Sequence, residues 1–574
     1  WVKSNQCDEG ALCQLVFQFA DPDFQFPHAH YIACCQVMED KIFRSASFTG
    51  DFIHPNHSLF KHVEEKITRK MEVDPDWICM IDGSTDARIM IRDVLPTMRR
   101  VASGLAKVGF SKRDVLCLIT ENRCQVYFSL LATLASGGVL ATLVPYLPQD
   151  ELEKLLDQVK PKVILCCDLS EPTIQSIKEE GKLIDVHVYS FDDSRVFATF
   201  QTLMEDNGEA YPNDVEVDLH IDPILYLPTS GTTGLPKIIQ HSNFNFVTSY
   251  LNTGNRFHGK KAGRTLVLNC FYHFSGIFFC LGQITNTTSV ILSTPPHSAG
   301  SILSCIAKYK VDAAITFPFQ VAMLANCEDM CEHNWSSLQL LLTGGSKLHS
   351  NDRFNFERRY PGVELVELYA TSETILVTNA LSDLNQRIAE GSVGILESIV
   401  EAKVMDCKSG ATLGPGQAGE ICFRTPCLMI GYQGAPELTK EVVDEDGFYH
   451  TGDIGWIDDN GEVFITDRIK NFIKFQTKET SIITIYSTDI ENVILGHPDV
   501  YDVGVCNTSH PEFQEVPRAY VKLRKGSRIT EERLLNYANG KLDDIHQIRG
   551  GLKFVDKIPR NYNGKILRNK LRSL

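Results

Sequence analysis

The feature that most constrains the fold is an alternation of short, largely apolar runs with helical patterns between residues 115 and 189. The apolar runs occupy residues 115–119, 139–144, 163–167 and 186–189. Between them, residues 124–135 and a segment that begins at a predicted Asp150 N-cap show helical spacing of apolar residues. Strands that are apolar on both faces, alternating with helices, predict a parallel sheet covered by helices. The predicted fold class is therefore α/β, with doubly wound, mixed or parallel sheets.

The pattern changes toward the end of the chain. From about residue 400, short strand-like runs alternate with turns that are rich in Gly and Asp, which predicts a small β-layer. Residues 468–574 carry strands and helices of their own and predict a small α+β domain, whereas residues 1–41 show no clear period. The predicted organisation is an unassigned extension over residues 1–41, a large domain over 42–467 and a small domain over 468–574.

Composition excludes some classes of function. The net charge of −16, from 56 basic and 72 acidic residues, argues against general nucleic-acid binding. The 18 cysteines are scattered without a C-x-x-C pair, which favours an intracellular, reducing compartment. The apolar stretch at residues 271–292 contains His273 and other polar residues, so it predicts core and no integral membrane segment. Cytosol and peroxisome both remain open, because the C-terminal tripeptide is not Ser-Lys-Leu.

One stretch has the chemistry of a phosphate-binding loop. Thr229-Ser230-Gly231-Thr232-Thr233-Gly234-Leu235-Pro236-Lys237 follows an apolar run at residues 224–227. Glycines let backbone N–H groups approach an anion, hydroxyls add donors, and the lysine adds a positive charge. The spacing differs from the P-loop of nucleotide hydrolases. A surface turn is the alternative, but in a parallel sheet such a loop lies where ligands bind, beyond the carboxyl ends of the strands.

Four further motifs follow in order. Their sequences are Thr343-Gly344-Gly345-Ser346, Leu368-Tyr369-Ala370-Thr371-Ser372-Glu373-Thr374, Tyr449-His450-Thr451-Gly452-Asp453 with Asp467-Arg468-Ile469-Lys470 after it, and Asn561-Tyr562-Asn563-Gly564-Lys565. Each has a plain structural alternative: a glycine turn, a helix start, a turn former, and a hairpin that leaves Lys565 on an exposed tip.

Together these motifs resemble those of the adenylate-forming enzymes, which include acyl-CoA synthetases, 4-coumarate–CoA ligase-like enzymes and beetle luciferases. The resemblance covers about residues 42–574. It implies a large N-terminal domain and a small mobile C-terminal domain. It also implies an ATP- and Mg²⁺-dependent enzyme that converts a carboxylic acid into acyl-AMP and then transfers the acyl group to CoA.

The resemblance also implies site residues. The catalytic residues would be Lys565, Thr232 and Glu373, and Glu373 would hold Mg²⁺. ATP or AMP would be bound by Thr229, Ser230, Gly231, Thr232, Thr233, Gly234, Lys237, Gly345, Ser346, Glu367, Leu368, Tyr369, Ala370, Thr371, Ser372, Asp453, Arg468 and Lys565. The acyl or CoA region would include His273, Phe274, Gly344, Lys470 and Lys474, with Lys470 at the hinge between the domains. A core histidine is the alternative for His273.

The sequence departs from the family pattern after Lys474. The best alignment puts Thr477 where the family has a glycine that the pantetheine arm of CoA passes, and it leaves residues 478–482 as an insertion. This departure predicts robust adenylation and a slow thioester step. Other second steps, namely carrier-protein transfer or luciferase-like oxidation, and a family member that binds without turnover, remain alternatives. Phe244, Phe246 and Phe274 near the motifs suggest an apolar fatty or aryl acid.

Overall fold

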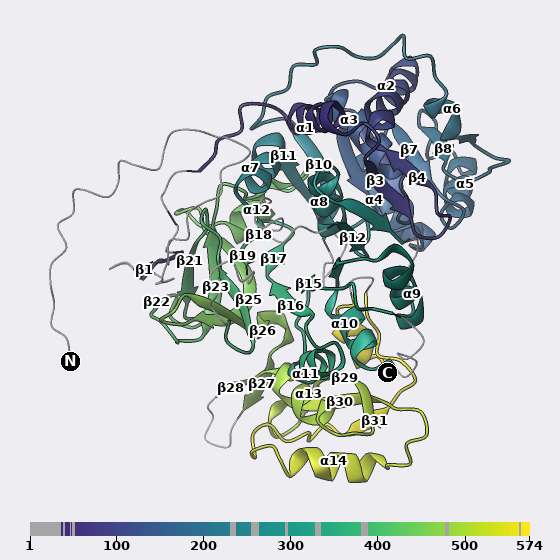
Figure 1. Ribbon diagram of the computed structural model, residues 1–574. Helices are drawn as coiled ribbons and strands as arrows, with labels where there is room; N and C mark the ends of the chain where they lie inside the picture. The colour runs from purple at the N-terminus through teal and green to yellow at the C-terminus, as the bar shows by residue number, and fades with distance from the viewer. Residues whose placement is uncertain are drawn as a thin grey trace.

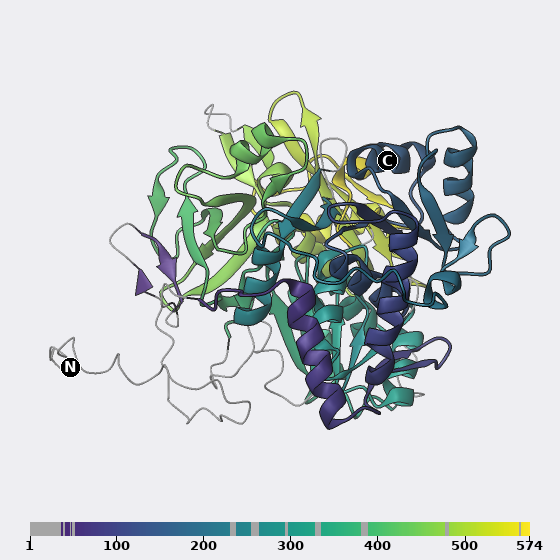
Figure 2. The same ribbon diagram turned by 90° about the horizontal axis from the view of Figure 1, so that it is seen from above.

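The structure is a computed structural model that describes residues 36–37, 41–45, 48, 52–229, 237–253, 263–292, 297–327, 334–379, 388–476, 482–561 and 564–574. Two helix-covered sheets, an antiparallel β-layer and a small C-terminal domain surround a common centre (Figure 1). The small domain lies against the layer and against helix α11 (Ser350–Arg359) (Figure 1). In the view from above, the green layer and the yellow-green small domain lie side by side (Figure 2).

The first sheet has eight strands in the order β24-β11-β10-β6-β5-β7-β8-β9. Neighbours from β10 to β9 are parallel, whereas β11 is antiparallel to both β10 and β24. The strands are β5 (Val115–Ile119), β6 (Val139–Thr142), β7 (Val163–Cys166), β8 (His187–Ser190), β9 (Ala198–Thr199), β10 (Pro223–Pro228), β11 (Ile238–Ser242) and β24 (Gly431–Tyr432).

The second sheet has seven strands in the order β16-β15-β14-β12-β13-β3-β4, all parallel except at β4. The strands are β3 (Ile78–Asp82), β4 (Arg88–Met90), β12 (Arg264–Val267), β13 (Thr288–Ile291), β14 (Ala313–Thr316), β15 (Leu340–Gly344) and β16 (Glu364–Leu368).

Helices lie between these two sheets and on their outer faces. In β5, Leu116 and Leu118 join the central core, whereas Cys117 and Ile119 join the outer core, so the strand is buried on both faces as its sequence predicts. The central layer contains α1 (Leu59–Val73), α2 (Ile91–Lys107), α3 (Val126–Ala135), α7 (Asn243–Thr253) and α8 (Phe274–Gln283). The outer faces carry α4 (Gln149–Val159), α5 (Glu171–Glu179), α9 (Ala299–Tyr309), α10 (Pro318–Ala325) and α11, and α6 (Gln201–Met204) packs against α2.

The predicted β-layer is a nine-stranded antiparallel sheet in the order β1-β2-β21-β23-β25-β26-β20-β19, with β22 paired to β21. The strands are β1 (Gln36–Val37), β2 (Phe43–Arg44), β19 (Thr378–Asn379), β20 (Ser392–Leu396), β21 (Glu401–Met405), β22 (Thr412–Leu413), β23 (Gly419–Arg424), β25 (Tyr449–Ile457) and β26 (Glu462–Arg468). Helix α12 (Pro436–Val442) lies beside β24, and β17 (Ala370–Thr371) forms a small hairpin with β18 (Ile375–Leu376).

The small domain has its own core around Ile473, Ile490, Val503 and Val521. A five-stranded sheet contains β27 (Ile473–Gln476), β28 (Ile482–Ile485), β29 (Val500–His510), β30 (Gln514–Leu523) and β31 (Leu552–Phe554). Its helices are α13 (Ser487–Leu495), α14 (Glu531–Asn539) and α15 (Arg568–Arg572), and a 3-10 turn at η3 (Ile469–Asn471) connects it to β26.

Two local predictions need correction. Helix α4 begins two residues earlier than predicted, so Asp150 lies in its first turn and Pro148 takes the N-cap position. The Ser-Glu-Thr sequence at 372–374 is not a helix start, because it forms the turn between β17 and β18. Among the described residues, every helix is too short or too polar to cross a bilayer.

Candidate active site

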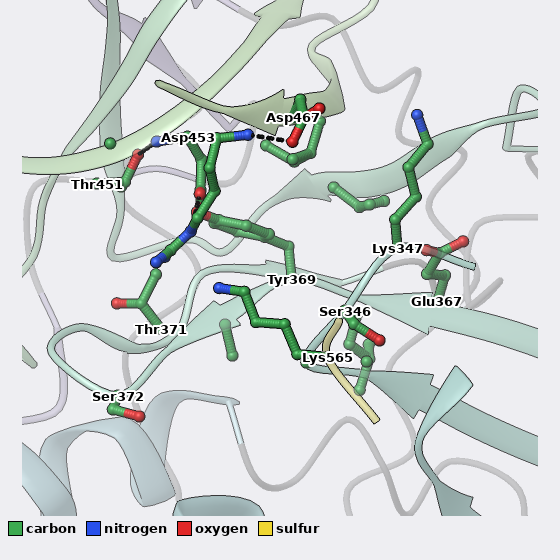
Figure 3. A pocket seen from close by; sticks show the side chains of 18 of the residues that line it. Ser346, Lys347, Glu367, Tyr369, Thr371, Ser372, Thr451, Asp453, Asp467 and Lys565 are labelled. Atoms are coloured by element: carbon green, nitrogen blue, oxygen red, sulfur yellow. Dashed lines mark hydrogen bonds and ion pairs between the residues drawn. The ribbon is translucent and has the colours of Figure 1, made fainter. Parts of the chain in front are cut away.

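A cavity of about 1440 Å³ opens where the large domain, the β-layer and the small domain meet. It is lined by 18 of the predicted site residues: Thr229, Lys237, His273, Phe274, Gly344, Gly345, Ser346, Glu367, Leu368, Tyr369, Ala370, Thr371, Ser372, Glu373, Asp453, Arg468, Lys470 and Lys565. Figure 3 shows Lys565, Tyr369, Asp453 and Ser346 around the same space. Segments more than 300 residues apart in the sequence therefore share one site.

The predicted phosphate loop leaves β10 and returns in β11. Its ends meet, because the Thr229 N–H donates to the Lys237 carbonyl at 2.8 Å and the Lys237 N–H reaches Thr229 Oγ1 at 3.3 Å. The Lys237 ammonium lies over the Tyr432 ring, 4.6 Å from its centroid. Ser230, Gly231, Thr232, Thr233 and Gly234 lie outside the described residues, so the loop's own conformation stays a prediction.

The β17–β18 hairpin presents Glu373 to the cavity. The Tyr432 hydroxyl donates to Glu373 Oε1 at 3.1 Å, and the Met429 N–H holds the Glu373 carbonyl at 2.7 Å. His241 Nε2 donates to the Ser372 carbonyl at 2.7 Å, and burial lowers the pKa of His241 to about 4. The imidazole is therefore neutral at pH 7, and it anchors the hairpin beside the carboxylate.

Glu373 fits the role of a magnesium ligand. A hard cation that binds a nucleotide typically takes one or two carboxylates together with phosphate oxygens. The Glu373 carboxylate lines the cavity with one oxygen fixed by Tyr432, and the cationic Lys237 lies against the same tyrosine. Glu373 therefore offers one oriented carboxylate as a metal ligand, and phosphate oxygens bound near Lys237 could supply further ligands.

Asp453 connects three of the motifs. Its Oδ2 accepts from the Tyr369 hydroxyl at 2.6 Å, and its Oδ1 accepts from Arg468 Nε at 2.6 Å. Burial and the Asp453 charge raise the pKa of Tyr369 well above its usual range, so the phenol stays protonated and donates. A carboxylate offers about four lone-pair sites. Asp453 therefore keeps acceptor capacity toward the cavity.

Glu367 has a structural role in the Gly344–Ser346 turn. Its carboxylate accepts from the Leu348 N–H at 3.2 Å and from Arg353 Nη2 at 3.2 Å. Burial raises the pKa of Glu367, and the Arg353 charge opposes that rise. Glu367 therefore lies at the cavity wall but uses its oxygens to hold the turn, where Gly345 has φ +90°.

Lys565 does not stand on an exposed tip. Its side chain points into the cavity toward Tyr369 and Asp453 (Figure 3), and burial lowers its pKa to about 8, with the Arg468 charge adding to the effect. Asn561 holds the turn, because its Oδ1 accepts from the Lys565 N–H at 2.8 Å. Gly564 has φ +77°, and a Cβ there would overlap Phe319 of the large domain. The backbone of this turn therefore packs directly against the large domain.

An apolar arm of the cavity contains Phe274, Phe278, Phe279, Ile315 and Leu342. His273 stands at this arm, and its Nδ1 accepts from the Ser275 N–H at 3.3 Å. The hydrogen on this imidazole is consequently on Nε2. Burial lowers the pKa of His273 to about 4, so it is a neutral donor.

Two other aromatic residues are expected beside the acid, but they lie elsewhere. Phe246 packs behind Phe274, with ring centroids 5.6 Å apart, and Phe244 stacks on His220. Neither lines the cavity.

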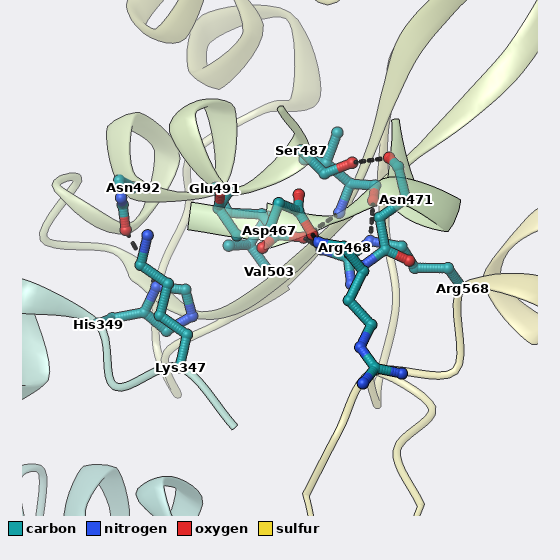
Figure 4. Close-up of polar contacts among 12 residues, drawn as sticks. Lys347, His349, Asp467, Arg468, Asn471, Ser487, Glu491, Asn492, Val503 and Arg568 are labelled. Atoms are coloured by element: carbon teal, nitrogen blue, oxygen red, sulfur yellow. Dashed lines mark hydrogen bonds and ion pairs between the residues drawn. The ribbon is translucent and has the colours of Figure 1, made fainter. Parts of the chain in front are cut away.

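The hinge follows β26. Asp467 Oδ1 accepts from the Arg468 N–H at 2.7 Å and from Asn471 Nδ2 at 2.8 Å, which fixes the 3-10 turn that contains Lys470 (Figure 4). Inside the small domain, Arg568 pairs with the buried Glu491 at 2.7 Å. Lys470 lines the cavity and lies between the two domains.

Besides the bond from the Thr488 hydroxyl to the Thr466 carbonyl next to the hinge, at 3.2 Å, three hydrogen bonds further from the hinge join described residues of the two domains. His349 Nδ1 donates to Asn492 Oδ1 at 3.0 Å (Figure 4). The other two run from Asn351 Nδ2 to the Leu495 carbonyl at 2.9 Å and from Arg524 Nη2 to Asn326 Oδ1 at 2.9 Å. The small domain is therefore fixed with Lys565 inside the cavity.

Lys474 is the exception among the described site residues. It is exposed on β27 opposite Thr484, does not line the cavity, and its N–H donates to Glu515 Oε2 at 2.8 Å. Thr477 and residues 478–481 lie outside the described residues, so the inferred insertion stays a prediction.

Sequence reasoning missed Tyr432, His241 and Lys347. Residues 237, 239 and 241 share a face of an extended segment, so the placement of His241 beside the site could have been found from strand parity. Tyr432 pairs with Ile239 through strands distant in sequence, and Lys347 Nζ reaches the carbonyl of Thr466 in β26 at 3.4 Å. No local pattern announces these two contacts.

Comparison with known proteins identifies the family of the chain. Residues 67–433 match the profile of the AMP-binding enzymes, and residues 489–565 match that of the AMP-binding enzyme C-terminal domain. A probable 4-coumarate–CoA ligase 3 of Dictyostelium discoideum is 30% identical over 535 residues, which cover 90% of this chain and 94% of that protein. The 4-coumarate–CoA ligase CCL1 of Humulus lupulus is 30% identical over 557 residues, 93% of this chain and 97% of that protein. ATP-bound MatB from Rhodopseudomonas palustris has the same fold, with a TM-score of 0.79 and 24% identity over 90% of this chain and 98% of that one.

Proposed function

The chain belongs to the AMP-binding enzyme family, and from that premise we propose that it is an acid–thiol ligase. It activates a carboxylic acid with ATP and then transfers the acyl group to CoA. In the first step a carboxylate oxygen attacks the α-phosphorus of ATP, and pyrophosphate leaves to give acyl-AMP. In the second step the CoA thiolate attacks the acyl carbon, and AMP leaves.

The observation that carries the proposal is the position of Lys565. Lys565 lies near the end of the chain, yet it reaches a cavity beside Asp453 and Arg468. The other predicted site residues that line this cavity precede it by about 100 to 330 residues. An ammonium group held there can neutralise charge that develops at the α-phosphate in the transition state, where fixed charges are most effective. Lys565 is thereby assigned to adenylation.

The other residues receive roles from their places in the cavity. Lys237 and the loop of residues 229–237 bind the phosphates, Asp453 and Arg468 bind the ribose and phosphate side of AMP, and Tyr369 packs against the nucleotide. Glu373 would hold Mg²⁺, which when bound supplies positive charge to the phosphate oxygens. Thr232 is proposed as a phosphate donor on its sequence alone.

The apolar arm suggests the acid. Phe274, Phe278 and Phe279 offer flat and aliphatic substrates an apolar wall, while the His273 Nε2–H is a neutral donor at its edge. The relatives named above as 4-coumarate–CoA ligases favour an aryl acid, and a fatty acid remains the second candidate.

The experiment is a panel of aryl and fatty acids scored for acid-dependent ATP–pyrophosphate exchange and for AMP release, each with and without CoA. Exchange without CoA, with AMP and acyl-CoA formed only when CoA is added, is the expected result. Exchange without any thioester would leave a different second step. No exchange with any acid would favour a member that binds without turnover.

A further inference from the structure

The ribose-binding motif is built on a β-bulge whose shape is held by a glutamate outside all the sequence motifs. We infer that Glu420, with His450, is a positioning pair that sets the Asp453 carboxylate for the two ribose hydroxyls of ATP. This inference rests on the proposed function, since it concerns how Asp453 meets the nucleotide.

The bulge is visible in the strand register. Glu420 of β23 pairs with Ile454 of β25, and Cys422 pairs with His450. One residue on β23 therefore opposes three on β25, the Thr451-Gly452-Asp453 segment. Gly452 has φ +68°, a left-handed conformation that favours glycine. Bulges beside active sites re-aim side chains, and this one turns Asp453 into the cavity.

Glu420 spans the bulge. Its Oε1 accepts from the Gly452 N–H at 2.9 Å, and its Oε2 lies 3.0 Å from His450 Nδ1. The bulge is also fixed from within, because the Thr451 hydroxyl donates to the Ile421 carbonyl at 2.7 Å and accepts from the Asp453 N–H at 2.9 Å. Of these bonds, only the Glu420 bond satisfies the N–H of the residue with positive φ.

His450 is held between two carboxylates. Its Nε2 lies 3.5 Å from Asp444 Oδ2, and Asp444 is itself paired with Lys403 at 2.6 Å. Cys422 Sγ lies 3.5 Å from Nδ1 on the neighbouring strand. The hydrogen bond to Glu420 and the charges of Glu420 and Asp444 raise the pKa of His450, while burial opposes the rise.

The protonated ring can serve both carboxylates, because both of its nitrogens are donors. The neutral ring has one N–H and must leave one carboxylate without it. We call the contacts of Glu420 with Gly452 and His450 the brace of the bulge. We expect this brace to loosen as the pH rises through the raised pKa of His450.

Glu420, Cys422 and His450 are also the one group of described residues that could hold a metal ion. Their polar atoms are instead bonded to one another and to Gly452, and Lys403 brings positive charge to the same cluster. The arrangement favours a brace over a metal site.

The test uses the full-length protein and direct binding of two nucleotides, ATP and 2′,3′-dideoxy-ATP, which lacks the ribose hydroxyls. In Glu420→Ala we expect ATP affinity to fall about tenfold, the order of one lost buried hydrogen bond, with dideoxy-ATP affinity changed less than about twofold. Glu420→Gln keeps an acceptor for Gly452, so it should bind ATP nearly as well as wild type but lose the alkaline weakening expected of wild type. Glu445→Gln changes an exposed carboxylate beside Asp444 that does not line the cavity, so it is the control and should behave as wild type.

Equal loss of affinity for both nucleotides in Glu420→Ala would overturn the inference, as would an unchanged ATP affinity. If Glu420→Ala does not fold, Glu420→Gln and His450→Gln decide the matter through the pH dependence of ATP affinity, which both should abolish. A wild type that binds the two nucleotides equally well would instead contradict the proposed role of Asp453. This outcome differs from failure of the Glu420 inference, because it is found with the wild-type protein alone.

Discussion

At the scale of single residues, Lys565 is a cation in a position that burial makes unfavourable for its charge. A lysine has an ordinary pKa near 10.5, and burial beside Arg468 lowers this one to about 8. Because the folded pKa is lowered, the charged form costs stability at every pH below 8, and that cost fades as the pH rises toward 10.5. The residue is retained in a place that folding disfavours, which is typical of groups with a catalytic task.

Lys565→Ala should therefore slow adenylation on the order of 10²–10³-fold without lowering stability. The physical reason is the loss of charge stabilisation that matters mainly in the transition state, together with relief of a buried charge. Rates of pyrophosphate exchange and melting temperatures of both proteins are the measurements. A variant that melts well below wild type, or that exchanges at the wild-type rate, would contradict the assignment.

The lowered pKa also predicts a pH profile. The ratio kcat/KM for adenylation should fall above about pH 8, because it reports the free enzyme, in which Lys565 loses its proton there. Lys565→Arg should be slower at neutral pH but keep its rate to higher pH, because a guanidinium stays charged. An identical alkaline limb in wild type and Lys565→Arg would show that another group titrates.

Glu373→Gln should raise the magnesium concentration that adenylation requires and slow the reaction. Glutamine keeps the shape and can still accept from Tyr432, but it lacks the charge that a hard cation prefers. Magnesium titrations of the two proteins at saturating ATP provide the comparison. An unchanged titration would return Glu373 to a purely structural role in its hairpin.

At the scale of elements, the predicted departure from the family pattern falls at the connection between β27 and β28. The strands pair from Ile473 with Ile485 to Gln476 with Ile482, and the predicted insertion begins after β27 and ends at Ile482 in β28. An insertion in a connection between strands costs little for folding, so we expect the domain core to be unaffected. The effect belongs to the second half-reaction, which uses this face of the small domain.

We therefore expect acyl-AMP to accumulate when CoA is present. Thr477 adds a Cβ where the family has glycine, and misplacement of a reacting group by about 1 Å can be costly. Single-turnover decay of acyl-AMP at saturating CoA should be slower in wild type than in a variant that lacks residues 478–482 and carries Thr477→Gly. If wild type consumes the adenylate as fast as it forms, the insertion is harmless.

Sequence patterns predicted the helices and strands better than they predicted which residues contact one another across the fold. Apolar runs such as residues 115–119 are local signals, and their strands and helices are confirmed. The glycine and carboxylate motifs also marked most of the cavity. The contacts of Tyr432, Glu420 and Lys347 join strands or domains that are far apart in sequence, so no local spacing announces them. The hairpin pattern by itself would leave Lys565 exposed, and its burial is missed for the same reason, since the large domain packs against its turn.

At the scale of the whole molecule, the two domains form one site only in the orientation seen here. Lys565 enters the cavity because the small domain is held by Asn351, His349 and Arg524 at the far side of the hinge. The proposed second step needs a different face of the small domain. If the small domain turns for that step as proposed, these three bonds break and form again in every catalytic cycle.

That cycle has a hydrodynamic consequence. A domain of about a hundred residues that swings through water meets friction from the solvent, whereas bond making inside an enclosed cavity does not. If the swing limits turnover, as domain motions often do, the full reaction should slow in proportion to viscosity when sucrose is added, while pyrophosphate exchange, which needs no swing, should not. Equal sensitivity of the two reactions would place the slow step inside the closed cavity.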